Sequence, residues 1–471
     1  MLSFKLHLNH NHAYNHSSRM HPRTGELTAP KHALDQEERT PRTAYELVHD
    51  EMFFDANPRL NMASFVTTWM EPEAVRLLME NLDKNLIDKP IYPQTIEIQN
   101  RCVSIIADLF NAGEDAAGTS TVGSSEAIHL CGLVMKWNWK QWHQEKYGIN
   151  AALKPNIVMG SNVQVCWKKF ALYFDIDLIE IPLNDENRLD EEAAIAKIDD
   201  NTIGVVGILG NTYSGEFDDI KKLDKLLDEN NKQRQRQVPL HVDAASGGGI
   251  APFTREHKDI VWDFRLKWVQ SINVSGHKYG LVYPGLGWAI WKRKSLIPQE
   301  LIFKIDYLGE SQDDFGLNFS RGAGQIIAQY YNFVRYGRDG YSRIMNGLMQ
   351  LHAELKIKIA SLKNEDDVPI FDLVSHDNGL PLICVSIAKP AADLGYTMEI
   401  LSHKTREKGW VLPVYTMSSP KDNLTVMRMV LKEGFNSDMA DKLVEDITWA
   451  VNEVTRTTKK PALSHGAHGI C

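Results

Sequence analysis

VPLHVDAASGGG, residues 238–249, and SINVSGHKYG, residues 271–280, decide the fold of this chain. Each stretch begins with a short apolar run and continues into small residues, and each carries a charged side chain, Asp243 or Lys278, at or shortly after the end of that run. Short runs that are apolar on both faces are typical of buried parallel strands. We therefore predict strands at Val238–Ala245 and Ser271–Ser275, near one another in a single sheet.

Further runs of the same kind lie on both sides of these two stretches. They are Asn156–Gly160, Asp177–Leu183, Thr202–Gly210 and Gly285–Trp291. Polar helical segments separate most of the runs, for example Phe217–Asn230. Alternation of strands and helices predicts an α/β domain with a largely parallel sheet. Ligands of such sheets bind in the loops beyond the carboxyl ends of the strands, which is where Asp243 and Lys278 fall.

The pattern changes after residue 320. Apolar residues spaced three and four apart predict one face of a long helix: Ile344, Leu348, Leu351, Leu355, Ile359 and Leu362. Strands are predicted next at Leu380–Ile387 and Leu424–Leu431, and helices at Thr397–Lys408 and Asp438–Arg456, the last with Ser437 as its N-cap. We therefore predict an N-terminal segment over residues 1–60, a large domain over 61–345 and a smaller α+β domain over 346–471.

Composition excludes several classes of protein. The 471 residues are 43% apolar and carry a net charge of −9, which argues against binding to nucleic acid through bulk positive charge. No run approaches the roughly 18 apolar residues of a membrane span, and the N-terminus lacks the apolar core of a secretory signal. Five scattered cysteines without a CxxC pair predict no disulfide framework, no zinc ribbon and a cytoplasmic location.

The first 32 residues are polar and rich in histidine. Such a tract could bind a metal ion or form a mobile tail. We favour the tail, because nothing in the spacing fixes a ligand geometry, and we predict no metal site.

Lys278 and Asp243 together match the needs of pyridoxal phosphate. A lysine held among small residues at a sheet edge loses its proton more easily when it is desolvated, and a neutral lysine forms Schiff bases. An aspartate at the same edge can keep the pyridine nitrogen of the cofactor protonated. Taken singly, Lys278 could equally be a solvated loop lysine and Asp243 a residue of a turn or a helix cap. The combination favours the cofactor.

Two further features point to bound anions. The stretch GTSTVGSSEA at 118–127 precedes an apolar helical segment, and glycine and hydroxyl residues at a helix start can cradle an anion. Ser124 and Ser125 would add hydroxyl donors, although ordinary N-capping explains Ser124 equally well. Arg428 lies on the apolar face of its predicted strand, so it calls for a carboxylate partner. That partner is either a residue of the fold or a substrate.

With these motifs the sequence resembles the pyridoxal-phosphate-dependent glutamate decarboxylases of bacteria and plants, which are group II amino-acid decarboxylases. The resemblance runs from about Ala44 to Phe435. It also includes NMASFVTTW (61–69), KNLID (84–88), VQVCWKKF (163–170), NTYSG (211–215), PQELIFKIDYL (298–308) and NFSRGAGQIIAQYY (318–331). It implies the aspartate-aminotransferase-like fold (fold type I), with a large mixed or parallel sheet domain and a small C-terminal domain. The implied activity is a lyase (EC 4.1.1.15) that converts L-glutamate to 4-aminobutyrate and CO2 and consumes a proton.

The resemblance implies a role for each matching residue. Lys278 forms the internal aldimine, and Asp243 pairs with the pyridine nitrogen. The cofactor phosphate is held by Ser124, Ser125, Ser275, His277 and, from the neighbouring subunit, Ser320. The ring and the reacting group are flanked by Gln164, Ala245 and Thr212. The two carboxylates of the substrate are bound by Arg428 (the α-carboxylate) and by Ser64, Phe65, Asn85 and Asp88 (the distal one). Tyr307, in a mobile loop, delivers a proton.

The implied partners are glutamate and a second copy of the chain, since the site draws residues from two subunits. At least a homodimer is expected, and some relatives are hexamers. Ser64 stands where the family commonly has threonine and keeps the hydroxyl. Lys168 replaces a variable family residue and is not expected to stack on the ring. His465 and His468 match poorly the family tail that closes the site, and the 11 residues after Lys460 are too short for a calmodulin-binding tail.

Other activities remain open on the residues alone. A decarboxylase for aspartate or for an aromatic amino acid is the nearest alternative, although the polar Ser64, Asn85 and Asp88 disfavour an aromatic side chain. An aminotransferase, and a protein of this fold that binds the cofactor without turnover, are the others. Asp88 also motivates the hypothesis that the enzyme favours acid conditions, because two facing carboxyl groups bind best when one is protonated.

Overall fold

The computed structural model describes residues 29–36, 38–150, 152–306, 311–418, 421 and 423–459. Contacts divide the chain into two compact units, Met1–Asn57 and Pro58–Cys471. The described part of the first unit holds helix α1 (Pro41–Glu51) and the 3-10 turn η1 (Met52–Phe54). Thr40 caps α1 by accepting the N–H of Thr43 at 3.2 Å, and Pro41 suits the first helical position. No residue of α1 is buried.

The second unit is built on a seven-stranded sheet. Its strands are β1 (Ala117–Thr121), β2 (Asn156–Gly160), β3 (Asp177–Ile181), β4 (Thr202–Ile208), β5 (Leu240–Asp243), β6 (Val269–Val274) and β7 (Gly287–Trp291). The strand order is β1-β7-β6-β5-β4-β2-β3, with β7 antiparallel to both neighbours and the pairs from β6 to β3 parallel. The predicted α/β domain with a largely parallel sheet is therefore confirmed.

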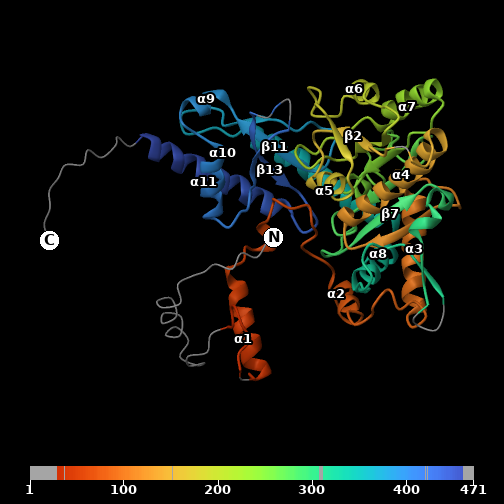
Figure 1. The fold of residues 1–471 in the computed structure, drawn as a ribbon. Helices are drawn as coiled ribbons and strands as arrows, with labels where there is room; N and C mark the ends of the chain where they lie inside the picture. Colours follow the sequence, from red (N-terminus) through yellow and green to blue (C-terminus); the bar gives the residue numbers. More distant parts are fainter. Residues whose placement is uncertain are drawn as a thin grey trace. The chain divides into compact units, whose positions relative to one another are not determined.

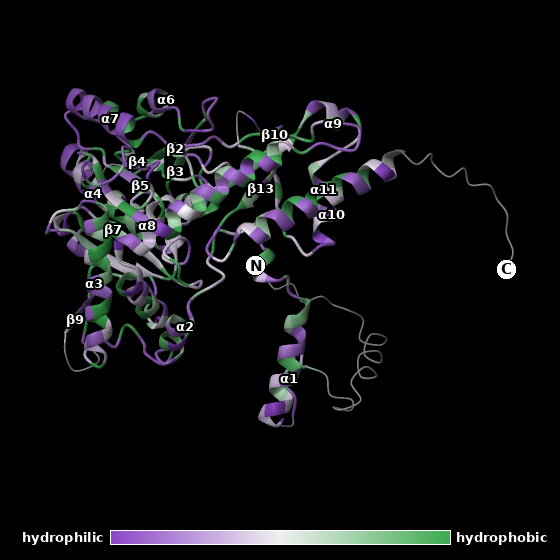
Figure 2. Ribbon diagram, turned by 180° about the vertical axis from the view of Figure 1, so that it is seen from behind, coloured by the Kyte–Doolittle hydropathy of each residue, from purple (hydrophilic) through white to green (hydrophobic). Residues whose placement is uncertain are grey.

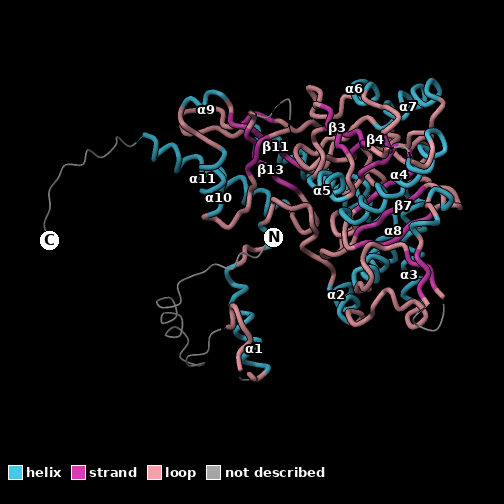
Figure 3. The backbone as a smooth tube through the Cα atoms, viewed as in Figure 1, coloured by secondary structure: helices cyan, strands magenta, loops and turns pink. Residues whose placement is uncertain are grey.

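Helices cover both faces of this sheet, as Figure 3 shows. They are α2 (Pro72–Met79), α3 (Pro93–Leu109), α4 (Ser124–Tyr147), α5 (Val165–Tyr173), α6 (Glu191–Ala196), α7 (Ile220–Arg234) and α8 (Gly324–Ala360). Strand side chains alternate between the two faces. On β2, Val158 packs into the core that includes α3 and α7, whereas Ile157 and Met159 pack against α4 and α5. No helix in the described parts of the chain is long and apolar enough to cross a membrane.

A second, antiparallel sheet lies beside the first, with helices α9, α10 and α11 around it (Figure 1). These elements are β10 (Phe371–Leu373), β11 (Leu382–Ile387), β12 (Val414–Thr416), β13 (Thr425–Val430), α9 (Lys389–Asp393), α10 (Met398–Arg406) and α11 (Ser437–Lys459). The sheet has its own core, which includes Met427, Trp410 and Leu443. Figure 2 shows apolar and polar residues alternating along α10 and α11, as expected for helices that bury one face.

Short elements complete the unit. They are β8 (Phe303–Ile305), β9 (Gln312–Asp314) and the 3-10 turns η2 (Pro58–Leu60), η3 (Gly247–Gly249), η4 (Lys294–Leu296) and η5 (Gln299–Leu301).

Helix α8 connects the two sheets. It begins twenty residues before Ile344, the first residue of the predicted helical face, and Gly337 at φ 54° interrupts its regular geometry. Met345 belongs to the core of the large sheet, whereas Leu355 and Ile359 belong to the core of the small one. The predicted domain boundary after residue 345 thus falls inside the part of α8 that follows Gly337.

Two local predictions need correction. The strand predicted at Val238–Ala245 is shorter, because Pro239 has no N–H to donate and the chain turns after Asp243 into η3. Ser437 is not the N-cap of α11 but lies inside the helix. The cap is Asn436, whose side-chain oxygen accepts the N–H of Met439 at 3.0 Å.

Candidate active site

A cavity of about 490 Å³ lies at the carboxyl edge of strands β4, β5 and β6. It gathers residues from six separate parts of the sequence. They include Ser64, Phe65, Ser124, Ser125, Asn162, Gln164, Thr212, Asp243, Ala245, Ser246, Ser275, His277 and Lys278. Eleven of the sixteen predicted site residues line it, and a twelfth, Arg428, contacts its lining; these twelve lie between 64 and 428 in the sequence. The sheet edge brings them together because parallel strands end on one side.

Lys278 follows β6 and lies partly buried in this cavity. Its amine donates to the hydroxyl oxygen of Ser246 at 3.1 Å and lies 5.3 Å from the centre of the Phe65 ring. Burial lowers the pKa of the amine below its ordinary value, and Arg428 acts in the same direction, whereas Asp243 opposes the shift. A lysine with a lowered pKa is the more easily neutral and nucleophilic.

Asp243 ends β5, the strand next to β6, and three N–H groups hold its carboxylate. One oxygen accepts from the side chain of Asn273 at 2.9 Å and from the backbone of Ala245 at 3.1 Å. The other accepts from the indole of Trp167 at 2.9 Å. A buried carboxylate is costly unless it is hydrogen-bonded, and these donors meet that requirement for the ionised form.

The start of α4 and the loop after β6 form a polar cradle. Ser124 is not an N-cap, because its hydroxyl bonds that of Ser275 at 2.7 Å instead. His277 accepts the backbone N–H of Leu286 at its Nδ1 atom at 3.2 Å, so its Nε2 atom carries the proton of the neutral ring. Burial, aided by Lys278, lowers the pKa of His277 to about 4 and keeps the ring neutral. A Cβ atom at Gly123 would lie 3.1 Å from the His277 ring, so glycine allows this close approach without a shift of the ring.

Arg428 has no carboxylate partner among the described residues of the fold. Its guanidinium donates to the backbone oxygens of Thr212 and, at 2.6 Å, Ala63. It also lies over the rings of Phe65 and Tyr415, each with its centre 5.2 Å away. The ion-pair alternative within the fold is thus wrong for the described residues, where backbone oxygens and aromatic faces satisfy the charge. The Nε atom has no hydrogen-bond partner among them.

The remaining lining residues come from loops. Gln164 caps α5 by accepting the N–H of Cys166 at 2.6 Å, and Ser64 accepts the N–H of Val66 at 3.1 Å. Lys168 points elsewhere and pairs with Glu180 at 2.7 Å. This agrees with the prediction that Lys168 is not a ring-stacking residue.

Besides Arg428, three described predicted residues lie outside the lining of this cavity, namely Asn85, Asp88 and Ser320. Asn85 donates to the Ser320 hydroxyl at 3.4 Å and accepts the N–H of Arg321 at 3.1 Å, and Asp88 lies three residues further on. Asn85 and Ser320 are thus neighbours. Tyr307, His465, His468 and the histidine tract before residue 29 lie outside the described residues.

Sequence reasoning missed four residues at this site. Ser246 bonds Lys278, Trp167 bonds Asp243, and Glu126 accepts the N–H of Val122 at 2.8 Å. Asn162 is 1% exposed, and its amide makes no hydrogen bond in the described structure. Ser246, Trp167 and Glu126 lie in the stretches HVDAASGGG, VQVCWKKF and GTSTVGSSEA, which mark this part of the site, whereas Asn162 carried no signal.

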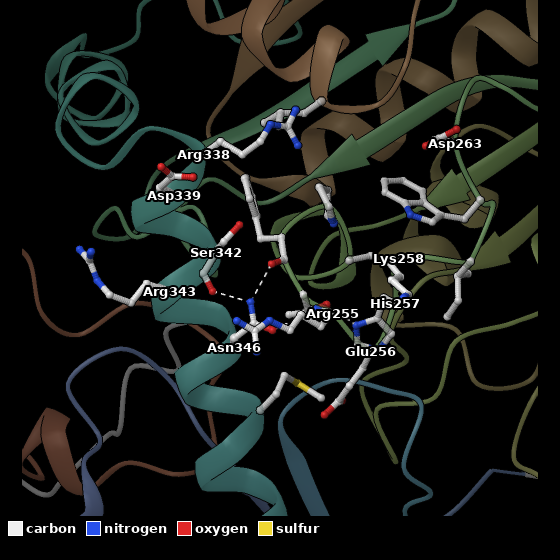
Figure 4. A pocket seen from close by; sticks show the side chains of 18 of the residues that line it. Arg255, Glu256, His257, Lys258, Asp263, Arg338, Asp339, Ser342, Arg343 and Asn346 are labelled. Carbon is white, nitrogen blue, oxygen red and sulfur yellow. Dashed lines mark hydrogen bonds between the residues drawn. The ribbon is translucent and has the colours of Figure 1, made fainter.

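A second cavity, larger at about 1170 Å³, lies between the loop after η3 and helix α8. Figure 4 shows Arg338, Arg343 and Asn346 on α8, with the side chain of Asn346 beside Arg255. Asn346 joins the two walls by donating to the backbone oxygen of Phe253 at 2.9 Å. None of the predicted site residues lines this cavity. Within the described ranges, no group of three or more His, Cys, Asp or Glu side chains could hold a metal ion.

Known sequences resemble this chain over most of its length. The model of the pyridoxal-dependent decarboxylase conserved domain matches residues 34–388. Glutamate decarboxylase 5 of Arabidopsis thaliana is 46% identical over 430 residues, which cover 90% of this chain and 83% of the relative. Glutamate decarboxylase of Lactococcus lactis is 45% identical over 435 residues, which cover 92% of this chain and 91% of the relative.

Solved structures agree with these relatives. The structure of Lactobacillus brevis glutamate decarboxylase matches with a TM-score of 0.87 and 41% identity, covering 93% of this chain and 97% of that chain. Sphingosine-1-phosphate lyase of Burkholderia pseudomallei matches with a TM-score of 0.74 at 19% identity, covering 92% and 95%. The second likeness bears on the fold alone. Together with the two sheets described above, these matches confirm the predicted fold class, fold type I.

Proposed function

Since the chain belongs to the pyridoxal-dependent decarboxylase family and its cofactor is pyridoxal phosphate, we propose that it is a glutamate decarboxylase (EC 4.1.1.15). The reaction removes the α-carboxylate of L-glutamate as CO2, gives 4-aminobutyrate and consumes one proton. The observation that carries this proposal is the cavity in which Lys278, Asp243 and the Ser124–Ser275 pair meet at the sheet edge. The 45–46% identity to glutamate decarboxylases supports glutamate as the substrate.

The residues of the cavity fit the cofactor. A buried amide without a partner, as at Asn162, is expected where a bound ligand supplies the hydrogen bond. The free N–H groups and dipole at the start of α4 favour an anion there. The cofactor phosphate would be held next to the start of α4 by Ser124, Ser125, Ser275 and His277.

Lys278 would attach the cofactor through its amine, and Asp243 would face the pyridine nitrogen. Gln164 and Ala245 would flank the ring. When bound, pyridoxal phosphate supplies a conjugated ring that accepts the electron pair left by the departing carboxylate. The three N–H donors around Asp243 favour its carboxylate form, and a carboxylate beside the ring nitrogen favours protonation of that nitrogen.

Arg428 would bind the α-carboxylate of the substrate. Its Nε atom has no partner in the described structure, and the Phe65 ring limits the directions from which a carboxylate can approach. Thr212 would lie beside the same carboxylate, because its backbone oxygen already fixes the guanidinium. A bound carboxylate would also exclude water from the charge, which strengthens the pairing.

The distal carboxylate of glutamate would meet residues from two subunits. Ser64 and Phe65 line the cavity in the same chain, whereas Asn85, Asp88 and Ser320 do not. The hydrogen bond between Asn85 and Ser320 supports the proposal that these residues act as one group toward the site of a second copy. We propose at least a homodimer, with a hexamer compatible.

Tyr307, which lies outside the described residues, is proposed to deliver the proton. Four cysteines, Cys102, Cys131, Cys166 and Cys384, are buried and free, which supports a cytoplasmic location.

Product analysis tests the proposed function. The purified protein, loaded with pyridoxal phosphate, is incubated with glutamate, aspartate or an aromatic amino acid at acid and neutral pH. We expect 4-aminobutyrate from glutamate and no amine from the others. An amine from another amino acid would keep the cofactor chemistry and overturn the assignment of the distal pocket. Bound cofactor without any product would indicate a protein that binds without turnover.

Replacing Asp88 with asparagine is expected to flatten the pH dependence of kcat/KM. A carboxyl group that faces the distal carboxylate of the substrate repels it when both are ionised, so wild-type activity should rise toward acid pH. The amide of Asp88→Asn removes that repulsion and should raise relative activity near neutral pH. Steady-state kinetics of both proteins between about pH 4 and about pH 8 measure this pH dependence. Identical profiles for the two proteins would rule out this role of Asp88.

A further inference from the structure

Four buried polar side chains are connected to the carboxylate of Asp243 by hydrogen bonds, two of them directly, and none of the four reaches the cavity. They are His241, Ser271, Asn273 and Trp167, each at most 2% exposed. None of the four lines the cavity that holds Lys278, whereas Asp243 does. Buried polar groups cost free energy unless they are paired, and apolar residues would pack at these positions without that cost. An effect of these side chains on the cofactor would therefore act through Asp243.

The sheet places these residues in one block. His241 lies directly opposite Ser271, and Asp243 directly opposite Asn273, on the paired strands β5 and β6. Residues two apart on a strand share a face. The side chains of His241, Asp243, Ser271 and Asn273 therefore lie on the same side of the sheet. Trp167 on α5 contacts this group of residues in two ways. Its indole N–H donates to Asp243, and its ring packs edge-on against the His241 ring, with the ring centres 5.3 Å apart. The intervening Val242 and Ile272 pack into the core on the opposite face.

The hydrogen bonds of this block have a single direction. Asn273 donates its amide N–H to Asp243 at 2.9 Å, so its amide oxygen remains as the acceptor toward His241, 2.8 Å away. The Nε2 atom of His241 must therefore carry a proton. Burial lowers the pKa of His241 to about 4, so the ring is neutral and its Nδ1 atom has no proton. Nδ1 must then accept from the hydroxyl of Ser271 at 2.8 Å.

Every donor in the chain thus points toward Asp243. The sequence of donation is Ser271 to His241, His241 to Asn273 and Asn273 to Asp243, with Trp167 donating to the second carboxylate oxygen. Hydrogen bonds aligned in this way polarise one another and strengthen the last bond. Reversing the Asn273 amide would turn its oxygen toward an ionised carboxylate and its N–H toward a protonated nitrogen. The alignment therefore suits an acceptor at position 243, and an ionised carboxylate supplies acceptors at both oxygens.

We propose that Trp167, Asn273, His241 and Ser271 are positioning residues that keep Asp243 ionised and fixed in direction, so that it holds the proton on the cofactor's ring nitrogen. This inference rests on the proposed function and assigns the four residues to the control of that one proton. Trp167 and Asn273 act directly on the carboxylate. His241 and Ser271 act one and two bonds further away, by holding Asn273 in the donating orientation.

The chain offers a matched pair of variants for the test. Trp167→Phe removes the N–H that reaches Asp243 and keeps an aromatic ring in the core. Trp410→Phe makes the same change at a tryptophan that is 2% exposed and donates to the buried carboxylate of Asp446 at 2.9 Å, in the core of the small sheet. Both variants lose one buried indole–carboxylate bond, so they should lose similar stability. Only the first should affect the cofactor.

The readout is the protonation of the ring nitrogen, followed by ¹⁵N NMR of the protein loaded with ¹⁵N-labelled pyridoxal phosphate. We expect a protonated nitrogen in wild type and in Trp410→Phe, and a signal shifted toward the neutral form in Trp167→Phe. The dissociation constant of the cofactor should rise about tenfold in Trp167→Phe, the scale of one lost hydrogen bond to a charged group. Asn273→Leu, which removes the second donor, should shift both quantities in the same direction.

The outcomes separate this inference from the proposed function. A protonated nitrogen and an unchanged dissociation constant in both Trp167→Phe and Asn273→Leu would overturn the positioning role and leave Asp243 in place. An unprotonated nitrogen in wild type would contradict the role of Asp243 itself, and with it the inference. Should Asn273→Leu fail to fold, the comparison of Trp167→Phe with Trp410→Phe still tests the positioning role, because each of these variants loses one buried indole–carboxylate bond.

Discussion

Replacing Lys278 with alanine is expected to lower kcat on glutamate by on the order of 10⁴-fold or more, the scale seen when a covalent catalytic group is removed. The amine of Lys278 has a pKa lowered by burial and points to Ser246 inside the cavity. No other lysine lines that cavity in the described structure. Steady-state product formation and the absorption spectrum of the loaded protein check the loss of activity and of covalently held cofactor.

Lys168→Ala is the control for this variant. Lys168 lies in the conspicuous stretch VQVCWKKF but is exposed and paired with Glu180 on the surface. Because exposed ion pairs contribute little, its loss should leave kcat and the spectrum unchanged. Activity of Lys278→Ala near the wild-type level would rule out the covalent role.

Replacing Asp243 with asparagine is expected to lower kcat by on the order of 10²- to 10³-fold, the scale on which the loss of one charge-stabilising group acts. The amide keeps an oxygen for Asn273 and Ala245, so the cofactor should stay attached. Its NH2 group would face the indole N–H of Trp167, however, and two donors cannot pair. We expect a loss of about 1–3 kcal/mol in the free energy of unfolding from this mismatch.

Asp263→Asn separates the two effects of that variant. Asp263 is 2% exposed and bonds Asn111 at 2.8 Å and Arg265, away from the cavity of Lys278. Its substitution should lower the free energy of unfolding and leave kcat close to wild type. Urea denaturation together with steady-state kinetics measures both quantities. Equal losses of kcat in the two variants would indicate a general effect of destabilisation.

Much of the fold could be predicted because its signals are local. The six strand predictions between residues 156 and 291 all correspond to strands of the large sheet, since all of them except the edge strand β3 are short runs buried on both faces. The placement of Asp243 and Lys278 at one edge followed from the same reasoning, because parallel neighbours end on the same side.

Other features depend on contacts that the sequence does not encode locally. The partners of Arg428 are the backbone oxygens of Thr212 and Ala63, distant in sequence, and backbone groups leave no compositional trace. The direction of Trp167 toward Asp243 depends on how α5 packs on the sheet. The early start of α8 was missed because its first half covers the large sheet with an irregular apolar pattern and is interrupted at Gly337.

The cofactor is proposed to be held in the cavity at the sheet edge through Lys278. The most direct test is reduction of the loaded protein with borohydride, followed by digestion and mass spectrometry of the modified peptide. Lys432 provides the internal comparison, because burial lowers the pKa of its amine to about 8 although it does not line the cavity. We predict the phosphopyridoxyl group on Lys278 alone. The same group on Lys432 or on any other lysine would contradict the account.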